Sequence, residues 1–208
     1  MAEYTLYCFG ESGNAYKAAL MLTLCELDWK PQWVDFFNGE TRTPEYRNDV
    51  NVMGEVPVLL HGARKLSQSG VILDYLAETS RKFGPKSDDE RREVMRWMLF
   101  DNHKLTASVA SLRYMISLAK TGETPVTDWL RGRTLGALKV LDAHLSQQPY
   151  VIGKRATIAD FSLCGYLYYG EELPFDLDRF AHVQNWLDRI RDLKGWKHPY
   201  DLMPRKAA

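Results

Sequence analysis

The hydrophobic period of this sequence changes once, near residue 80, and that change constrains the fold more than any other feature. Before it, Tyr4 to Phe9 and Trp33 to Phe37 have the short apolar pattern typical of strands. The segment between them, Ala15 to Leu27, has its apolar residues at helical spacing. Two strands joined by a helix predict a parallel βαβ unit.

A predicted hairpin and helix complete the first unit. Val56 to Leu60 is a β-branched apolar run, and Lys65 to Ser67 follows it after a turn. Ser69 then opens a helix with apolar residues on one face. This order of elements is that of a thioredoxin-like fold, which we predict for residues 1–80.

After an exposed linker rich in charge, with Gly84 and Pro85, the chain is predicted to be all helical. Apolar residues recur there at helical spacing in three stretches: Val94, Met98, Leu105, Val109, Leu112 and Ile116; Leu138, Leu141 and Leu145; Val183, Trp186, Leu187 and Ile190. The predicted fold class is therefore α/β plus all-α, with an all-helical second domain over residues 88–208.

One motif of the second domain is assigned to folding. Thr157 to Asp160 matches the capping box, in which a threonine hydroxyl and an acidic side chain satisfy the first amides of a helix. The mostly apolar segment Phe161 to Tyr169 follows it. Capping of a buried helix explains the motif without any chemical role.

Charge and hydropathy exclude several classes of function. Lys plus Arg and Asp plus Glu each count 27, so the chain has no basic excess with which to bind nucleic acid or an anionic membrane. No stretch reaches 18 uninterrupted apolar residues, and the N-terminus lacks the pattern of a signal peptide. We predict a cytoplasmic protein that binds neither nucleic acid nor membrane.

The three cysteines, Cys8, Cys25 and Cys164, are widely spaced. Neither a disulfide framework nor a CxxC metal or redox motif is present in the sequence. We expect reduced, buried thiols and no metal site.

Three short segments of the first unit converge on one predicted crevice. Ser12-Gly13-Asn14 lies between the first strand and the first helix, and Gln68-Ser69 begins the next helix. Pro57 interrupts a strand-like run, which requires an edge, a bulge or a cis bond. Ser12 and Ser69 each fit a helix cap when taken alone. Ligands of open α/β sheets bind near strand carboxyl ends and helix N-termini, where all three segments should meet.

Taken together, the motifs of the chain resemble the glutathione transferase family over nearly the whole length. They are Leu6-Tyr7 with Ser12 five residues later, Asn51 to Leu59, Gln68 to Leu76, and Thr157 to Asp160. The resemblance implies the glutathione transferase fold, a role in detoxification, and glutathione as co-substrate with a small hydrophobic electrophile. It also implies a homodimer.

The resemblance assigns glutathione contacts to the first domain. Val56, before a cis Pro57, would pair its backbone with the cysteinyl part of glutathione, as an added strand does. Gln68 and Ser69 would hold the γ-glutamyl end, and Arg42 is the candidate for the glycine carboxylate.

Two residues are candidates for activating the sulfur. Ser12 occupies the position of the activating serine of theta-like classes, and Ser12-Gly13-Asn14 also resembles the hydroxyl-x-asparagine signature of the bacterial nu class. Asn14 is then a second donor. Gly13 stands where beta-class relatives carry a catalytic cysteine, so a mixed disulfide with the protein is not expected.

Further candidates come from the second domain. Trp97, Phe100, His103 and Lys104 resemble a run of beta-class transferases whose histidine and lysine approach the glutathione site. Tyr114 and Tyr166 are candidates for the pocket of the electrophile.

Elementary energetics support the role of Ser12. A free thiol with a pKa of about 8.5 is only a few per cent thiolate at neutral pH. One hydrogen bond to the charged sulfur contributes roughly 1.5–3 kcal/mol, which lowers the pKa by about one to two units. The N-terminus of the following helix acts in the same direction. The sequence thus predicts a transferase in which glutathione thiolate attacks an electrophilic carbon.

Two alternatives stay open at this point. A nu-like disulfide reductase would use bound glutathione rather than a protein cysteine, and Ser12 and Asn14 suit that chemistry equally. A noncatalytic scaffold of the same fold is the other alternative, because the chain departs from the family at two positions. Gly54 stands where the family often places a basic or polar residue, and Gln68 stands where many members carry an acid. Maleylacetoacetate isomerase is less favoured, because the Ser-Ser-Cys signature of the zeta class is missing around Ser12.

Overall fold

The computed structural model describes residues 2–205, which divide into two compact units. Residues 2–84 and 194–205 form the first unit, and Pro85–Leu193 form the second. The first unit contains a sheet with helices and the second contains helices throughout, so the predicted fold class is confirmed. Within residues 2–205, no helix combines the length and the apolar character needed to span a membrane.

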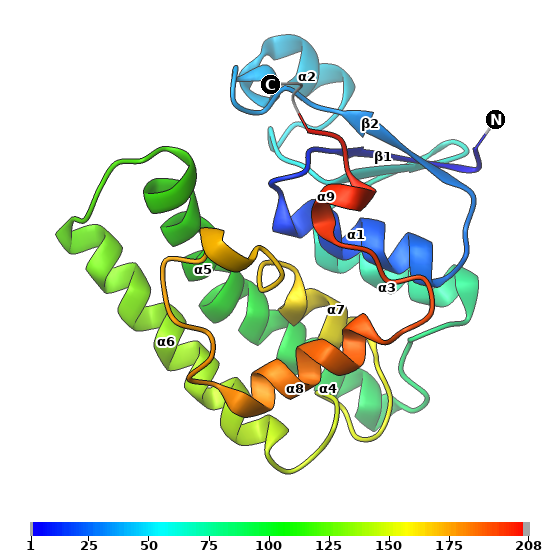
Figure 1. The fold of residues 1–208 in the computed structure, drawn as a ribbon. Helices are drawn as coiled ribbons and strands as arrows, with labels where there is room; N and C mark the ends of the chain where they lie inside the picture. Colours follow the sequence, from blue (N-terminus) through cyan, green and yellow to red (C-terminus); the bar gives the residue numbers. More distant parts are fainter. Residues whose placement is uncertain (1, 206–208) are drawn as a thin grey trace. The chain divides into compact units, whose positions relative to one another are not determined.

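The first unit contains a mixed four-stranded sheet with the strand order β2-β1-β3-β4 (Figure 1). β1 (Tyr4–Cys8) pairs in parallel with β2 (Trp29–Trp33) and antiparallel with β3 (Val58–His61). β4 (Arg64–Ser67) closes the predicted hairpin with β3. Residues of β1 alternate between buried and half-buried, as expected for a strand with one face on a core.

The helices of the first unit begin close to the predicted positions. α1 (Gly13–Leu24) connects β1 to β2, and α3 (Ser69–Ser80) follows β4. A 3₁₀ turn, η1 (Glu40–Arg42), and α2 (Pro44–Asp49) lie between β2 and β3 and were not predicted. The signal for α2 is present in the sequence, because Thr43 caps it and Pro44 occupies its first position.

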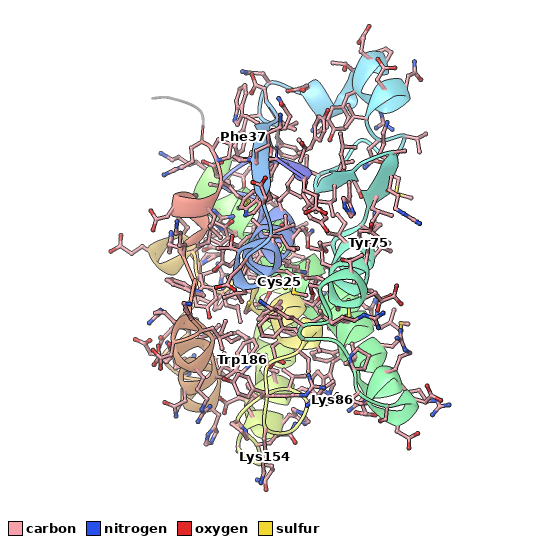
Figure 2. The ribbon with its side chains drawn as sticks, turned by 90° about the vertical axis from the view of Figure 1, so that its right-hand side faces the viewer. Cys25, Phe37, Tyr75, Lys86, Lys154 and Trp186 are labelled. Carbon is pink, nitrogen blue, oxygen red and sulfur yellow. The ribbon has the colours of Figure 1, made fainter. Side chains whose placement is uncertain are left out.

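The second strand lies four residues earlier than predicted, at Trp29–Trp33 rather than Trp33 to Phe37. β2 is an edge strand, and there Pro31 is tolerated because its missing N–H does not interrupt a central ladder. Phe37, labelled in Figure 2, packs edge-on against Phe9 after the strand has ended. The apolar run that suggested a strand therefore forms an aromatic cluster.

Residues 194–205 belong to the first unit, although the sequence analysis grouped them with the helical domain. α9 (Pro199–Leu202) lies against α1 (Figure 1). The Tyr16 hydroxyl donates to the carbonyl of Lys197 at 2.9 Å, and the Gly10 amide donates to the carbonyl of Pro204 at 2.8 Å. These long-range contacts decide the grouping, and no local pattern encodes them.

The second unit contains helices of very different lengths. Its elements are α4 (Asp88–Phe100), η2 (Asp101–Thr106), α5 (Ala107–Arg113), η3 (Tyr114–Leu118), α6 (Pro125–Leu145), α7 (Ile158–Cys164), η4 (Gly170–Glu172) and α8 (Ala181–Arg191). The single long helix predicted from Val94 to Ile116 is present, but η2 and η3 are π-helical segments within it. In η2, Thr106 donates to buried Asp101 at 2.8 Å, across the five-residue spacing of a π-turn.

The capping box of α7 is confirmed, and its acid is a central feature of the helical core. Asp160 is fully buried and accepts from the amides of Val151 and Thr157, each at 2.8 Å. The Thr157 hydroxyl at 3.0 Å and the Trp186 indole at 2.8 Å also donate to it. Burial raises the pKa of Asp160, and the four donors oppose that rise. Trp186, which donates to this acid, lies on α8 and is labelled in Figure 2.

Candidate functional site

Ser12 closes the turn between β1 and α1. Its amide donates to the carbonyl of Phe9 at 3.0 Å, and its Oγ accepts from the amide of Ala15 at 3.1 Å, so the predicted helix cap is confirmed. Accepting uses a lone pair of the oxygen and leaves the hydroxyl hydrogen to be donated. No acceptor for that hydrogen lies among residues 2–205. Capping thus holds the hydroxyl of Ser12, a residue that is 5% exposed, at the positive end of α1.

The N-termini of α1 and α3 bring two further polar side chains together. The Ser69 hydroxyl donates to Asn14 Oδ1 at 3.5 Å, and both residues are half-buried. α1 and α3 are neighbours in the first unit (Figure 1). Because its oxygen is used by Ser69, Asn14 presents its Nδ2 as a donor.

Val56 lies in a loop whose backbone is held by hydrogen bonds to the preceding residue. The bond between Val56 and Pro57 is cis, as predicted. The carbonyl of Glu55 accepts from the Tyr46 hydroxyl and from Asn51 Nδ2, each at 3.0 Å. Within residues 2–205 the backbone N–H and C=O of Val56 have no protein partner. A half-buried backbone with both groups unpaired can receive an extended peptide.

Gln68, just before α3, is paired with an acid that the sequence analysis missed. Its Nε2 donates to Glu55 Oε2 at 2.9 Å and lies 3.3 Å from Met53 Sδ. Both Gln68 and Glu55 are exposed. Glu55 therefore places a carboxylate beside a side chain that is itself uncharged. Its position next to Val56 was the signal that could have identified it.

A second residue missed from the sequence is Arg47 on α2. Its Nη1 donates to the carbonyl of Val52 at 3.0 Å, and its guanidinium lies directly over Gly54. Gly54 has a φ of +67°, and a Cβ there would lie 2.7 Å from the backbone oxygen of Thr41, so only glycine fits. The predicted cation, Arg42, ends the 3₁₀ turn η1 and is exposed.

His103 and Lys104 lie in η2 of the helical unit, and both are exposed. The carbonyl of His103 accepts from Arg133 Nη2 at 3.3 Å, and that of Lys104 accepts from the Ser108 hydroxyl. Neither contact uses the side chains of the two candidates. The π-turn therefore presents an imidazole and an ammonium on its surface.

The two candidate pocket tyrosines differ in accessibility. Tyr114, at the start of η3, is 42% exposed, whereas Tyr166 is buried with its ring centre 6.2 Å from that of Tyr169. Arg113, which precedes Tyr114 in the chain and is not predicted from the sequence, is only 1% exposed. Its guanidinium stacks over Tyr169 at 3.7 Å and pairs with Glu172.

All three cysteines are buried, as expected from the sequence. Burial raises the pKa of Cys8 to about 12. Burial also raises the pKa of Cys25, although Ser80 and Lys82 oppose it. Figure 2 shows Cys25 at the end of α1. All three thiols are shielded from solvent, so they do not supply a nucleophile.

We therefore expect native protein to react slowly with the thiol reagent 5,5′-dithiobis-(2-nitrobenzoic acid) at pH 7.5. In denaturant, three thiols per chain should react at once, because the sequence holds three cysteines and the structure has them free. A fast-reacting thiol in the native state would contradict this assignment and would restore a protein cysteine as a candidate nucleophile.

Comparison with known proteins identifies the family. Residues 2–78 match the sequence model of the glutathione S-transferase N-terminal domain, and residues 105–194 match that of the glutathione S-transferase C-terminal domain. The chain belongs to the glutathione S-transferase family. Solved glutathione S-transferases agree over their full length. One from Pseudomonas fluorescens is 31% identical, with a TM-score of 0.89 over 96% of this chain and 100% of that one.

Other relatives of this family differ in their activities. A theta class glutathione S-transferase from Xanthomonas axonopodis pv. citri, solved with glutathione bound, is 25% identical with a TM-score of 0.86, covering 100% of this chain and 99% of that one. Glutathione S-transferase F10 of Arabidopsis thaliana is 28% identical over 79% of this chain and 81% of its own length. The disulfide-bond oxidoreductase YfcG of Escherichia coli is 25% identical over 88% of each chain. A maleylacetoacetate isomerase of Rhizobium meliloti is 29% identical over 84% of this chain and 85% of its own.

Proposed function

We propose that the chain is a glutathione transferase in which Ser12 ionises the thiol of bound glutathione for attack on a small hydrophobic electrophile. The observation that carries this proposal is the geometry of Ser12. Its oxygen is fixed by the amide of Ala15, and its hydrogen is left to be donated to a ligand. Glutathione-dependent chemistry itself is supported by the family and by its transferase, oxidoreductase and isomerase relatives.

In this proposal glutathione lies along the part of the first unit that comes before residue 80. Its cysteinyl part pairs with the free backbone groups of Val56, ahead of Pro57, which puts the sulfur near the N-terminus of α1. Its γ-glutamyl end lies at Gln68 and Ser69, at the N-terminus of α3.

The ends of glutathione differ in charge, and so do the groups available to them. The γ-glutamyl ammonium can use the carboxylate of Glu55, which the neutral Gln68 cannot replace. The glycine carboxylate requires a cation, and Arg42 is the candidate from the sequence. Arg47, packed on Gly54, is the cation that the structure adds.

The reaction needs one deprotonation and one displacement, and it requires no metal. The thiol proton leaves to solvent, and the Ser12 hydroxyl donates to the sulfur anion, with Asn14 Nδ2 as a second donor. The thiolate forms a bond to the electrophilic carbon as the leaving group departs with its electron pair. The partial positive charge at the N-terminus of α1 stabilises the same anion.

We assign the electrophile to the helical second unit, Pro85–Leu193, with the exposed Tyr114 as its first contact and Tyr166 as part of the wall. His103 and Lys104 are proposed to assist glutathione binding from the π-turn η2. We also retain the homodimer and the cytoplasmic, detoxifying role as part of the proposal. Exposed apolar side chains support self-association: Val52 and Met53 in the first unit, and Met95 and Leu99 in the second.

A glutathione-dependent disulfide reductase is the second candidate, favoured by the similarity to YfcG and by Asn14 two residues after Ser12. Initial rates with 1-chloro-2,4-dinitrobenzene and with 2-hydroxyethyl disulfide, both in the presence of glutathione, separate the two. We expect turnover of the aryl halide. Turnover of the disulfide alone would favour the reductase. Glutathione binding without turnover of either compound would favour the noncatalytic scaffold.

A further inference from the structure

The turn that leads into Ser12 is held by the C-terminal segment of the chain. The amide of Ser12 donates to the carbonyl of Phe9, so Gly10 and Glu11 are the two central residues of this turn. The Gly10 amide donates to the carbonyl of Pro204 at 2.8 Å. The Glu11 carboxylate accepts from Arg205 Nε at 3.0 Å. Both central residues are thus bonded to two consecutive residues near the end of the described chain.

Close packing accompanies these bonds. A Cβ on Gly10 would lie 2.6 Å from Arg205 Cγ and 3.2 Å from the Tyr200 ring, so the tail runs directly over the turn. The Arg205 guanidinium stacks on the Tyr200 ring at 3.8 Å. The side chain of Glu11 is only 11% exposed, so this ion pair is largely shielded from water on its acidic side.

The same segment is also fastened to α1 at its other end. The hydroxyl of the fully buried Tyr16 donates to the carbonyl of Lys197 at 2.9 Å. Figure 1 shows α9 beside α1, with the chain continuing past the carboxyl end of β1. Residues 197–205 therefore bridge α1 and the turn that precedes it, with Ser12 at the junction of the two.

We propose that Pro204 and Arg205 are positioning residues of the glutathione site, and that the C-terminal segment sets the position of the Ser12 hydroxyl. The inference rests on the proposed function, because it concerns the serine that we assign to thiol activation. A hydrogen bond to sulfur weakens steeply as its length and angle depart from the optimum. A turn that is released at Gly10 and Glu11 should therefore keep its fold but lose part of the thiol activation.

Two substitutions test this by different physical means. Arg205→Ala removes the ion pair, and Gly10→Ala displaces the tail without changing any charge. For each we would measure the pH dependence of kcat/KM for the electrophile at saturating glutathione, and the ultraviolet absorbance of the bound thiolate as a function of pH. We expect the pH at which half of the bound glutathione is thiolate to rise by about one unit. At pH values below this midpoint, kcat/KM should therefore fall by about 10-fold. Rates should converge at high pH, and KM for the electrophile should stay unchanged.

Lys194→Ala is the matched control, because Lys194 comes just before this segment and its ion pair is with Glu26, which follows the opposite end of α1. Lys194→Ala should leave the pH profile unchanged. Arg205→Lys should shift the midpoint less than Arg205→Ala does. If wild-type protein ionises glutathione and both Arg205→Ala and Gly10→Ala keep its midpoint, the inference is overturned while the proposed function stands. If wild-type protein binds glutathione without ionising it, the proposed function fails and this inference fails with it.

Discussion

Replacing Ser12 with alanine should raise the pKa of the bound glutathione thiol by about one to two units. The physical reason is the loss of one hydrogen bond to a charged sulfur, worth roughly 1.5–3 kcal/mol. At pH 7, kcat/KM should fall by about 10- to 25-fold, because the thiolate fraction falls by that factor. Above pH 9 the two proteins should approach the same rate. The pH profile of kcat/KM for the electrophile, at saturating glutathione, measures this pKa directly.

The same substitution also removes a helix cap, so a control for that effect is needed. Ser87 caps α4 in the same way, with its Oγ accepting from the amide of Glu90 at 3.1 Å. Ser12→Ala and Ser87→Ala should each lower the free energy of unfolding by about 1 kcal/mol. Only Ser12→Ala should shift the pH profile. Equal losses of stability with two unchanged profiles would show that Ser12 is a cap and nothing more.

The largest loss of stability is expected for Asp160→Ala. The substitution leaves four buried donors without an acceptor: two amides, a hydroxyl and the Trp186 indole. Each stranded donor costs about 1–3 kcal/mol, so the free energy of unfolding should fall by at least about 4 kcal/mol. That is a large part of the roughly 5–15 kcal/mol that stabilises a domain. Urea unfolding followed by circular dichroism would measure it.

An exposed aspartate on α4 provides the comparison. Asp89 is almost fully exposed and pairs only with Arg92, three residues away. Asp89→Ala should change the free energy of unfolding by no more than about 0.5 kcal/mol. Asp160→Asn should fall between the two variants, because it keeps one acceptor oxygen and the shape of the side chain. Similar stabilities for Asp160→Ala and Asp89→Ala would mean that the buried network does not stabilise the helical unit.

The parts of the fold that follow from local pattern could be predicted. The alternation in β1, the helical spacing of α1 and α3, and the capping box before α7 each depend on residues close in sequence. The position of β2 could not be predicted, because the aromatic run at Trp33 to Phe37 fits the same pattern as a strand. The conformation of that run depends on its contacts with Phe9, which lies in another part of the chain.

The candidate site divides in the same way. Ser12, Pro57 and Ser69 sit at positions where local chemistry is distinctive, namely two helix starts and a strand interrupted by proline. Arg47 carries no such signal, and Glu55 is marked only by its position next to Val56. Their importance arises from the pairing of Glu55 with Gln68 and from the packing of Arg47 on Gly54, and both contacts join separate elements. The hydrogen bond from Arg205 to Glu11, in the turn that leads into Ser12, joins residues almost a whole chain apart, so no local sequence pattern predicts it.

The central claim is that this site ionises glutathione when it binds it. Isothermal titration calorimetry with glutathione at pH 7, in two buffers of different ionisation enthalpy, counts the protons released with each molecule bound. A thiol whose pKa falls by one to two units should release between about 0.2 and 0.7 proton per chain. Binding with that release, reduced in Ser12→Ala, is the result we predict. Binding with no proton release by the wild-type protein would contradict it.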